Sequence, residues 1–431
     1  ALATDFIAMH ETRLLVGIVL AAMGCLYALI VTALMWRSGR RKSYTRACAA
    51  EAMPRAAGAP GSGPAAATVA PGSTASVALS PRTAQTAAPA RTPRPAVTVL
   101  KALCGAEAGL YHQLRSFCVQ DYPALQLVFG VREAADPALQ VVRRLQQEFP
   151  RLDLAVVIDP SLHGSNRKIS NLINMLPAAQ HDLLVMADSD IVAPRDYLSH
   201  VSAALADPGV GLVTCAYFGR SGGGMASQLG AMFINEWFMP SVLLAARFGA
   251  RSFVSGATIA LRREVLDTVG GLRKLADQLA DDYKLGELVR GHGLRIVLSD
   301  IAVETSVEEP DIATLCRHEL RWLRTIRSAQ PLGYACCFPS FALPTALAGA
   351  ALAGFDTTAS VLLGIAAAAR LVLHSFAGTG RARERWQRLA LLPLRDALLA
   401  GLWGWSFCKR EIVWREQRYG IGQDGSLHRV G

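Results

Sequence analysis

The sequence has little of what several protein classes require. Its nine cysteines are scattered, with no CxxC pair and no ligand-like Cys/His spacing, so we expect small buried hydrophobic residues of a reducing compartment and not disulfides or zinc ligands. No GxxxxGK[ST] motif occurs, so a P-loop is unsupported. No basic stretch is rich in aromatic residues, which argues against nucleic acid as a partner.

What the sequence has in quantity is apolar surface and positive charge. Of its 431 residues 52% are hydrophobic, the mean hydropathy is +0.27 and the formal net charge is +10. Many arginines lie beside apolar segments, a pattern that favours contact with an anionic membrane surface. Residues 14–36 contain no charge and are long enough to cross a bilayer. Basic residues follow at 37 and 40–42 and predict that the next part of the chain is cytoplasmic; a cleaved signal sequence of unusual length is the alternative.

Composition divides the chain into four parts. Residues 1–49 form an N-terminal membrane anchor with a basic flank. Residues 50–96 are rich in Ala, Pro, Ser and Thr and cannot bury enough surface to fold, so we expect a disordered linker. Residues 97–330 are expected to form the main folded domain, and residues 331–431 are expected to supply C-terminal membrane and interfacial helices with a basic tail.

The C-terminal part contains three apolar segments. Residues 332–354 and 358–376 are expected to span the membrane, the second with Arg370 facing other helices or snorkelling. Residues 389–408 contain Arg395 and Asp396, and basic residues flank them on both sides. Because charges are costly at mid-bilayer, we expect this segment to lie at the interface or to re-enter without crossing. The chain then has three spans.

Short apolar runs alternate with helical patterns in the middle of the chain. This alternation predicts βαβ units and an α/β domain with a mostly parallel sheet. Strands are expected at 97–100, 125–131, 154–158, 182–191 and 210–214, with helices at 109–118, 137–149, 168–176, 228–246 and 317–327 and a Gly-rich loop at 219–225.

One strand ends in a pair of acids. The run DLLVMADSDI places Asp188 and Asp190 directly after a buried strand, where ligands of open α/β sheets bind. Two carboxylates at this spacing can hold a divalent cation that also grips a diphosphate. A helix N-cap is the alternative for a single Asp in this position.

Eight motifs in order carry a family resemblance. They are VTVLKALCGAE, RSFCVQDYP, FGVREAADPA, HGSNRKISNLINMLP, ADSDI, GATIALRREVL, LADDYKLGELVR and RHELRWLRTIR. From about residue 97 onward the chain resembles the inverting GT-A glycosyltransferases of processive-synthase type. Within them it is most similar to the ceramide glucosyltransferases and, by motif spelling, to bacterial hopanoid-biosynthesis glycosyltransferases. This implies a GT-A domain flanked by transmembrane helices at both ends.

The resemblance assigns roles to acidic and basic residues at successive stations. Glu133 and Asp136 are expected to hold the uridine, although Asp136 before Pro137 also suits an N-cap. Lys168 is expected to meet the diphosphate, an exposed helix lysine being the alternative. Asp188 and Asp190 would hold Mg²⁺ or Mn²⁺.

The remaining stations concern the acceptor and the leaving group. In Asp281-Asp282 the second acid is the expected catalytic base and the first its substrate-binding neighbour, with a solvated acidic turn as the alternative. In the box His318-Glu319-Leu320-Arg321-Trp322, which carries His where the family has Gln or Arg, the three expected site residues are His318, Arg321 and Trp322. In the tail, Arg415 and Arg418 match a WRxxRY feature near the nucleotide.

Together these features predict a multi-pass enzyme of the bacterial inner membrane with a cytoplasmic catalytic domain. The resemblance implies UDP-N-acetylglucosamine as donor and a bacteriohopanetetrol-type hopanoid as acceptor. Glucosylation of ceramide or diacylglycerol from UDP-glucose is a second possible reaction. An inactive membrane scaffold and a phosphohydrolase with a DxD nucleophile are less favoured. Expected partners are the UDP-sugar donor, the lipid acceptor and the bilayer; association with other lipid-biosynthesis enzymes is left open.

Overall fold

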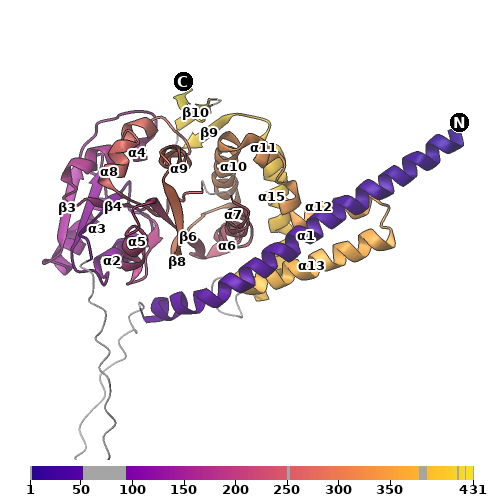
Figure 1. Cartoon of the computed structure of the whole chain (residues 1–431), viewed down its shortest axis with the longest axis horizontal. Helices are drawn as coiled ribbons and strands as arrows, with labels where there is room; N and C mark the ends of the chain where they lie inside the picture. The colour runs from indigo at the N-terminus through magenta and orange to yellow at the C-terminus, as the bar shows by residue number, and fades with distance from the viewer. Residues whose placement is uncertain are drawn as a thin grey trace, which may run out of the picture.

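An eight-stranded mixed sheet forms the centre of the molecule (Figure 1). The computed structural model describes residues 2–51, 94–249, 253–377, 386–414, 417–422 and 424–430. Almost the whole expected linker lies outside the described residues. The strand order is β3-β2-β1-β4-β7-β6-β8-β5, with β3, β2, β1 and β4 parallel and β7 antiparallel to both its neighbours. The strands are β1 (Val97–Ala102), β2 (Leu125–Val131), β3 (Asp153–Ile158), β4 (Leu183–Met186), β5 (Ile191–Val192), β6 (Val210–Ser221), β7 (Ile259–Arg262) and β8 (Arg295–Val307).

Helices cover both faces of this sheet. One hydrophobic cluster joins the sheet to α2 through Leu114, to α3 through Leu139 and to α5 through Leu198. The other cluster joins the opposite face to α4 through Ile169 and to α9 through Leu285. The helices of these layers are α2 (Leu110–Cys118), α3 (Ala138–Glu148), α4 (Arg167–Met175), α5 (Tyr197–Ala204), α8 (Arg263–Thr268) and α9 (Asp281–Gly291). The predicted α/β class with a mostly parallel sheet is confirmed.

The second half of the sheet differs most from the expectation. Strand β6 runs on to Ser221, so the expected Gly-rich loop is reduced to the residues just before α6 (Gly224–Phe233). The expected helix 228–246 is three segments, α6, the π-helical turn η2 (Ile234–Phe238) and α7 (Met239–Arg247). The 13-residue strand β8, which pairs with β6 and β5, was not expected.

Three helices in the described part of the chain are long and apolar enough to cross a membrane. They lie at Met9–Arg37 within α1 (Leu2–Glu51), at Gly224–Arg247 and at Thr357–Ala377, which is α13. The first and third match expected spans, and α1 and α13 run side by side (Figure 1). The Gly224–Arg247 segment is mostly buried in the protein and packs against β6.

Helix α1 meets the short helix α12 (Ala342–Leu352) through very small residues. A Cβ atom placed on Gly17 would lie 2.6 Å from the carbonyl oxygen of Gly349, and one on Gly349 would lie 2.4 Å from the amide nitrogen of Ala21. Only glycine permits such a close approach of two backbones, which is how small residues drive helix association in lipid. Helices from both ends of the chain therefore form one bundle.

The expectation of a continuous span at 332–354 is wrong. This region consists of α11 (Pro331–Ala335), the 3-10 turn η4 (Phe338–Ser340) and α12, whose 11 residues are too few to cross a bilayer. Pro331 and Pro339 begin the first two pieces, because proline fits the first turn of a helix but not its interior.

The two charges of the segment 389–408 are buried in ion pairs. The segment forms η5 (Leu389–Leu391) and α15 (Leu392–Ser406), which with 15 residues is shorter than a span. Arg395, 2% exposed, donates to both carboxylate oxygens of Glu319, at 2.6 and 2.7 Å. Asp396 pairs with Arg370 of α13 at 3.0 Å, and Arg370 also pairs with Glu236 of η2 at 2.6 Å. The charges therefore tie α15 to its neighbours, a role that sequence reasoning did not assign.

A second, three-stranded sheet closes the described chain. It has the order β11-β10-β9, from β9 (Glu411–Trp414), β10 (Gln417–Ile421) and β11 (Leu427–Arg429). The amide of Leu279 donates to the Gly425 carbonyl at 3.1 Å, and Leu427 donates back to Asp277. This small sheet therefore packs on the segment directly before α9, near the top of Figure 1.

Removing one partner of the Arg395–Glu319 pair should be costly. We expect Arg395→Met to lower the free energy of unfolding by about 3–5 kcal/mol, because Glu319 would remain buried without its countercharge. Thermal unfolding in detergent measures the effect. The double variant Glu319→Leu/Arg395→Met is the control and should recover most of the loss; an equal loss in both variants would contradict the explanation.

Candidate active site

The candidate site lies where strand β4 ends. After Met186 the chain turns through Asp188-Ser189-Asp190 and enters the short strand β5. Asp190 accepts a hydrogen bond of 2.5 Å from the Thr305 hydroxyl on β8, and the backbone amide of Ser306 donates to the Asp190 carbonyl. Strand β8 thus holds one carboxylate of the pair in place, at the carboxyl end of the central strand, as the sequence predicts.

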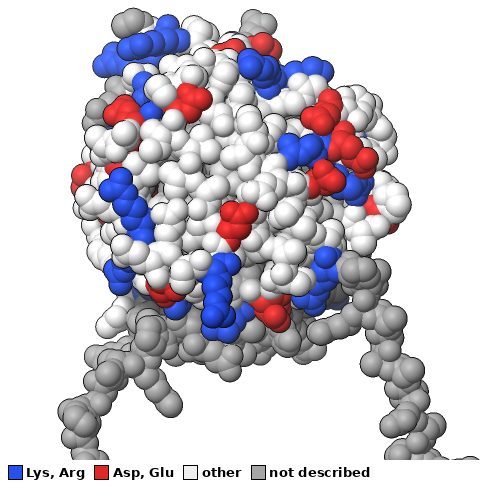
Figure 2. All heavy atoms as spheres, turned by 90° about the vertical axis from the view of Figure 1, so that its left-hand side faces the viewer, with Lys and Arg blue, Asp and Glu red and all other residues white. Residues whose placement is uncertain are grey.

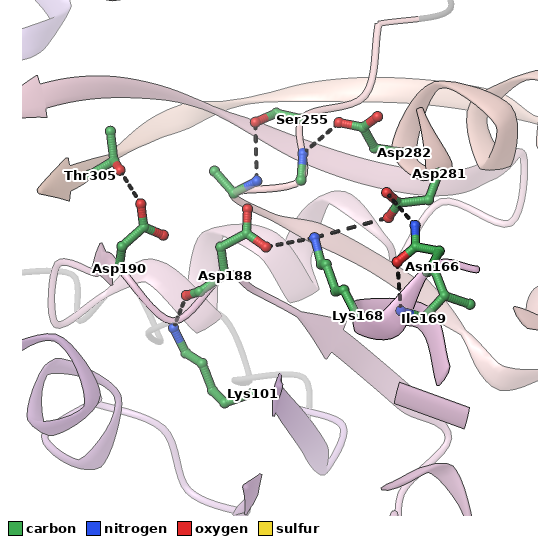
Figure 3. A network of polar contacts seen from close by, with 12 residues as sticks. Lys101, Asn166, Lys168, Ile169, Asp188, Asp190, Ser255, Asp281, Asp282 and Thr305 are labelled. Carbon is green, nitrogen blue, oxygen red and sulfur yellow. Dashed lines mark hydrogen bonds and ion pairs between the residues drawn. The ribbon is translucent and has the colours of Figure 1, made fainter. Parts of the chain in front are cut away.

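Lysine and aspartate side chains from three further segments converge on Asp188 (Figure 3). The Lys168 Nζ atom, from the first turn of α4, lies 2.6 Å from Asp188 Oδ1 and 4.0 Å from Asp281 Oδ2. Asp281 and Asp282 are the first residues of α9, where the helix dipole favours negative charge. Asp282 accepts from the backbone amides of Gly256 at 2.9 Å and Tyr283 at 2.7 Å. The second and third predicted stations are therefore brought together.

Gly256 lies at the centre of this convergence. A Cβ atom built there would lie 3.2 Å from Asp188 Oδ2, 3.3 Å from Lys168 Nζ and 3.6 Å from Asp282 Oδ2. The Ser255–Thr258 turn that carries it is fixed by hydrogen bonds between Ser255 and Thr214. A side chain at this position would enter the space between the charged groups and crowd Asp188 and Lys168.

Burial and mutual repulsion change the acidity of these carboxyl groups. Burial, and then the charge of Asp281, raise the pKa of Asp282 to about 7. Burial and Asp188 raise the pKa of Asp190 to about 6. For Lys168 burial opposes the charged form, but Asp188 and Asp281 outweigh it and raise the pKa, so this side chain stays an ammonium ion. The site thus combines a carboxyl group that titrates near neutrality with a permanent cation.

Two residues that sequence reasoning did not select hold this site together. Asn166, which is fully buried, caps α4 by accepting from the Ile169 amide at 3.1 Å. Its amide group donates to the Gln278 carbonyl at 2.9 Å and to Asp281 Oδ1 at 3.3 Å, so it fixes Lys168 and Asp281 relative to each other. An Asn directly before a helix was the available signal, but only for the cap.

Lys101 is the second missed residue. It follows the apolar run of β1 and is 0% exposed. Its ammonium group donates to the backbone carbonyl of Asp188 at 2.7 Å and lies 3.5 Å from the centre of the Phe117 ring. Burial lowers its pKa to about 7, against the opposing effect of Asp190 and Asp188. Lys101 therefore supports the Asp188 turn from beneath.

Asp188 and Asp190 suit a divalent cation that is shared with a substrate. Within the described chain no group of three or more His, Cys, Asp or Glu side chains is arranged to hold a metal alone. Mg²⁺ typically takes one or two carboxylates and completes its shell with phosphate oxygens and water. The hard oxygen donors of this pair, close to two further carboxylates, fit that requirement.

Glu133 and Asp136, which form the first predicted station, lie in the loop between β2 and α3. Asp136 accepts from the Gly105 amide at 3.0 Å and from the Ala138 amide at 2.9 Å. It therefore holds both the loop after β1 and the first residue of α3. Glu133 is exposed in the loop between β2 and α3. Figure 2 shows that acidic and basic side chains are interspersed on the face of the molecule that it draws. The role of Glu133 and Asp136 toward uridine stays a prediction.

The basic helix α10 (Ile312–Ala329) carries the predicted box. His318 lies 2.7 Å from Glu309 through its Nδ1 atom, and its ring meets Trp322 edge-on. Trp322 also contacts the Tyr217 ring edge-on. Burial and the charges of Asp282, Asp188 and Asp190 raise the pKa of Tyr217, so Tyr217 lies near these acids. Arg321 lies over the Trp414 ring of the C-terminal sheet, at 5.7 Å. Arg418 is exposed on β10, and Arg415 lies outside the described residues.

Comparison with known proteins identifies the family. The family model described as Glycosyl transferase family 21 matches residues 65–427. The chain belongs to this family. The matched residues include the acid cluster and the box on α10. The resemblance to ceramide glucosyltransferases that the motifs indicate is confirmed by the relatives of this family 21 chain.

Relatives of this family 21 chain are distant. Ceramide glucosyltransferase 1 of Caenorhabditis elegans is 25% identical over 206 residues, which cover 48% of this chain and 44% of that protein. The beta-monoglucosyldiacylglycerol synthase of Synechocystis is 24% identical over 245 residues, covering 53% and 47%. The chain thus spans about half the length of the curated relatives it matches.

Among the solved structures similar to this chain is that of the mannosyltransferase PcManGT from Pyrobaculum calidifontis in complex with GDP-Man and Mn²⁺. It has a TM-score of 0.47 and 23% identity, covering 89% of this chain and 99% of that one.

Asn166→Asp should damage the site although Asp caps helices well. The variant keeps an acceptor for the Ile169 amide but loses both donors and sets a second carboxylate against Asp281. We expect a loss of about 1–3 kcal/mol in unfolding free energy and weaker UDP binding, both measurable by thermal shift. Asn166→Ser removes the amide N–H donors, keeps only a shorter hydroxyl group and adds no charge, so it should have a smaller effect. Wild-type UDP affinity in both variants would contradict the joining role of Asn166.

Proposed function

We propose that this chain transfers a sugar from a UDP-sugar to a hydroxyl group of a membrane lipid, with inversion at the anomeric carbon. The observation that carries the proposal is the division of the acid cluster. One pair, Asp188 and Asp190, suits a cation and a diphosphate, while Asp282 lies beside it with a pKa raised to about 7. Family membership supports the same reaction class.

Asp282 acts as the general base. Its carboxylate is oriented by the Gly256 and Tyr283 amides and removes the proton of the acceptor hydroxyl as that oxygen attacks the anomeric carbon. A pKa near 7 leaves enough carboxylate at neutral pH and makes it a stronger base than an ordinary Asp. Asp281, held by Asn166, raises that basicity and borders the sugar.

The leaving UDP is stabilised on the other side of the cluster. A bound Mg²⁺ or Mn²⁺ would supply Lewis-acid stabilisation of the diphosphate, with Asp188 and Asp190 as its protein ligands. Lys168 and Arg321 supply positive charge to the same group, and Glu133, Asp136, Arg415 and Arg418 are proposed to border the nucleotide. His318, oriented by Glu309, donates a hydrogen bond at the edge of the site.

The acceptor site is proposed to lie along Trp322. This ring packs with Tyr217, Phe233 and Phe238, which lead from the acids toward η2. The turn η2 packs against the membrane helix α13. Such an apolar wall suits the body of a lipid whose hydroxyl reaches Asp282. The motif spellings favour UDP-N-acetylglucosamine and a bacteriohopanetetrol-type hopanoid.

A second candidate reaction is supported by the relatives. Their names describe a ceramide glucosyltransferase and a synthase of monoglucosyldiacylglycerol, which favour UDP-glucose as donor with ceramide or diacylglycerol as acceptor. Mass spectrometry of lipids made by membranes containing this protein, supplied with different UDP-sugars, separates the two. No glycosylated lipid with any donor, in preparations that bind UDP, would contradict both.

The two acid pairs should be separable by role. Asp282→Asn should abolish turnover while UDP binding survives, because the base acts on the acceptor. Asp188→Ala should instead weaken metal-dependent UDP binding. Turnover assays and equilibrium binding of UDP with Mn²⁺ measure both effects. Near-normal turnover of Asp282→Asn would show that another group is the base.

Activity should increase with pH through about 7. The base must be deprotonated, and burial with the charge of Asp281 raises its pKa, while Lys168 opposes this shift. The pH profile of kcat/KM should therefore rise from acidic pH and level off above about pH 8. In Asp281→Asn the rise should move to lower pH, because the neighbouring like charge is gone; an unshifted profile assigns the titration to another group.

The catalytic domain and the C-terminal tail are proposed to face the cytoplasm of a bacterial inner membrane. Basic residues flank the segment 389–408 on both sides, and α15 is too short to cross. Engineered cysteines at 381–388 and at 420–431 should therefore react with impermeant reagents from one side only, the same for both. Labelling from opposite sides would show that 389–408 crosses.

A further inference from the structure

The acid cluster holds two more carboxylates than ammonium groups. When all of these groups are ionised, the four carboxylates of Asp188, Asp190, Asp281 and Asp282 outnumber the ammonium groups of Lys101 and Lys168 by two charges, which one divalent cation would match. Without such a cation, these two lysines limit the repulsion between the carboxylates. The two lysines are bound in very different ways, and this difference indicates what each does.

The Lys101 side chain is held in one position by its surroundings. It is 0% exposed, its ammonium group bonds to a backbone carbonyl, and the Phe117 ring covers it. Lys168 is different, since its side chain is 26% exposed and its ammonium group is held by the side chains of Asp188 and Asp281. A long side chain on the first turn of a helix can change rotamer at little cost. Lys168 is therefore the exchangeable cation of the pair.

Lys168 also occupies an oxygen atom that the divalent cation needs. Its Nζ atom lies 2.6 Å from Asp188 Oδ1, the distance of a charge-assisted hydrogen bond. A cation bound to that oxygen and an ammonium group at this position would repel each other strongly in a partly buried site. Binding of the cation therefore requires that Lys168 leave Asp188.

We propose that Lys168 is an internal counter-cation that pairs with Asp188 when no divalent cation is bound and moves to the donor diphosphate when a cation and the diphosphate bind together. It competes with the cation alone but cooperates with the cation–diphosphate pair, whose negative charge gives the displaced ammonium group a new partner. The site thereby discriminates against a free divalent cation in favour of one that arrives with a diphosphate. The diphosphate part rests on the proposed function; the competition for Asp188 does not.

The variant Lys168→Met tests this through effects of opposite sign. It keeps the apolar stem and removes the charge. We expect Mn²⁺ alone to bind about 3- to 10-fold more tightly than to the wild-type protein. We expect UDP in the presence of saturating Mn²⁺ to bind about 10-fold more weakly. Isothermal titration of the full chain in detergent measures both. Lys274→Met, an exposed lysine on η3 (Leu272–Leu275), is the matched control and should change neither affinity.

The wild-type protein provides a second measurement that does not depend on a variant. An amine-acylating reagent followed by peptide mass spectrometry reports how available Lys168 is. Mn²⁺ alone should increase acylation of Lys168 because it frees the side chain from Asp188, whereas Mn²⁺ with UDP should protect it. Lys274 serves as the internal reference.

The outcomes separate the two proposals. Unchanged or weaker Mn²⁺ binding in Lys168→Met, or acylation that Mn²⁺ alone does not increase, overturns the counter-cation role. If both Mn²⁺ results are as expected but UDP neither binds nor protects, the exchange at Asp188 stands and the nucleotide assignment of the proposed function fails.

Discussion

Four carboxylates in one half-buried cluster repel one another, and the surrounding structure must offset that repulsion. Lys101 does so from beneath the Asp188 turn and Lys168 from the side. The amides of Gly256 and Tyr283 stabilise Asp282, and Asn166 fixes Asp281. These groups come from β1, α4, the turn before β7 and the start of α9, so the cluster can form only when both halves of the sheet have met. The site and the fold are thus mutually dependent.

The sequence predicted the first half of this fold well. Strands β1 to β4 have short, continuous apolar runs between helices of clear amphipathic period, and Asp188 and Asp190 stand directly after one of them. Strand β8 was missed because polar residues interrupt its apolar sequence, RIVLSDIAVETSV, and because its partners β6 and β5 are far away in the chain. Asn166 and Lys101 were missed as site residues because their partners, Gln278 and Asp188, lie 112 and 87 residues later. Hydrogen bonds between residues so far apart in the chain leave no local pattern in the sequence.

The charges of α15 show the same limit of local patterns. Read as isolated ions, Arg395 and Asp396 exclude their segment from an apolar environment. In the structure each has a buried partner, Glu319 on the helix that carries the box and Arg370 on the membrane helix α13. Aromatic contacts add to these ion pairs, since Trp322 packs against Phe233, Phe233 against Trp237, and Trp237 against Phe341. The box helix is therefore held against the membrane bundle by both polar and apolar contacts.

The close packing of α1 against helices from the far end of the chain has a consequence for the order of assembly. The Tyr27 hydroxyl bonds to Ser241, 214 residues later, and Thr32 bonds to the Ala369 carbonyl, 337 residues later. During synthesis α1 leaves the ribosome before α12 and α13, so its glycine-lined face has no partner until these helices emerge. Closing so large a loop is slow compared with pairing β1 and β2, which are close in sequence. The first strands of the α/β domain can thus pair before α1 finds its partners, and the bundle closes only after α12 and α13 have been made.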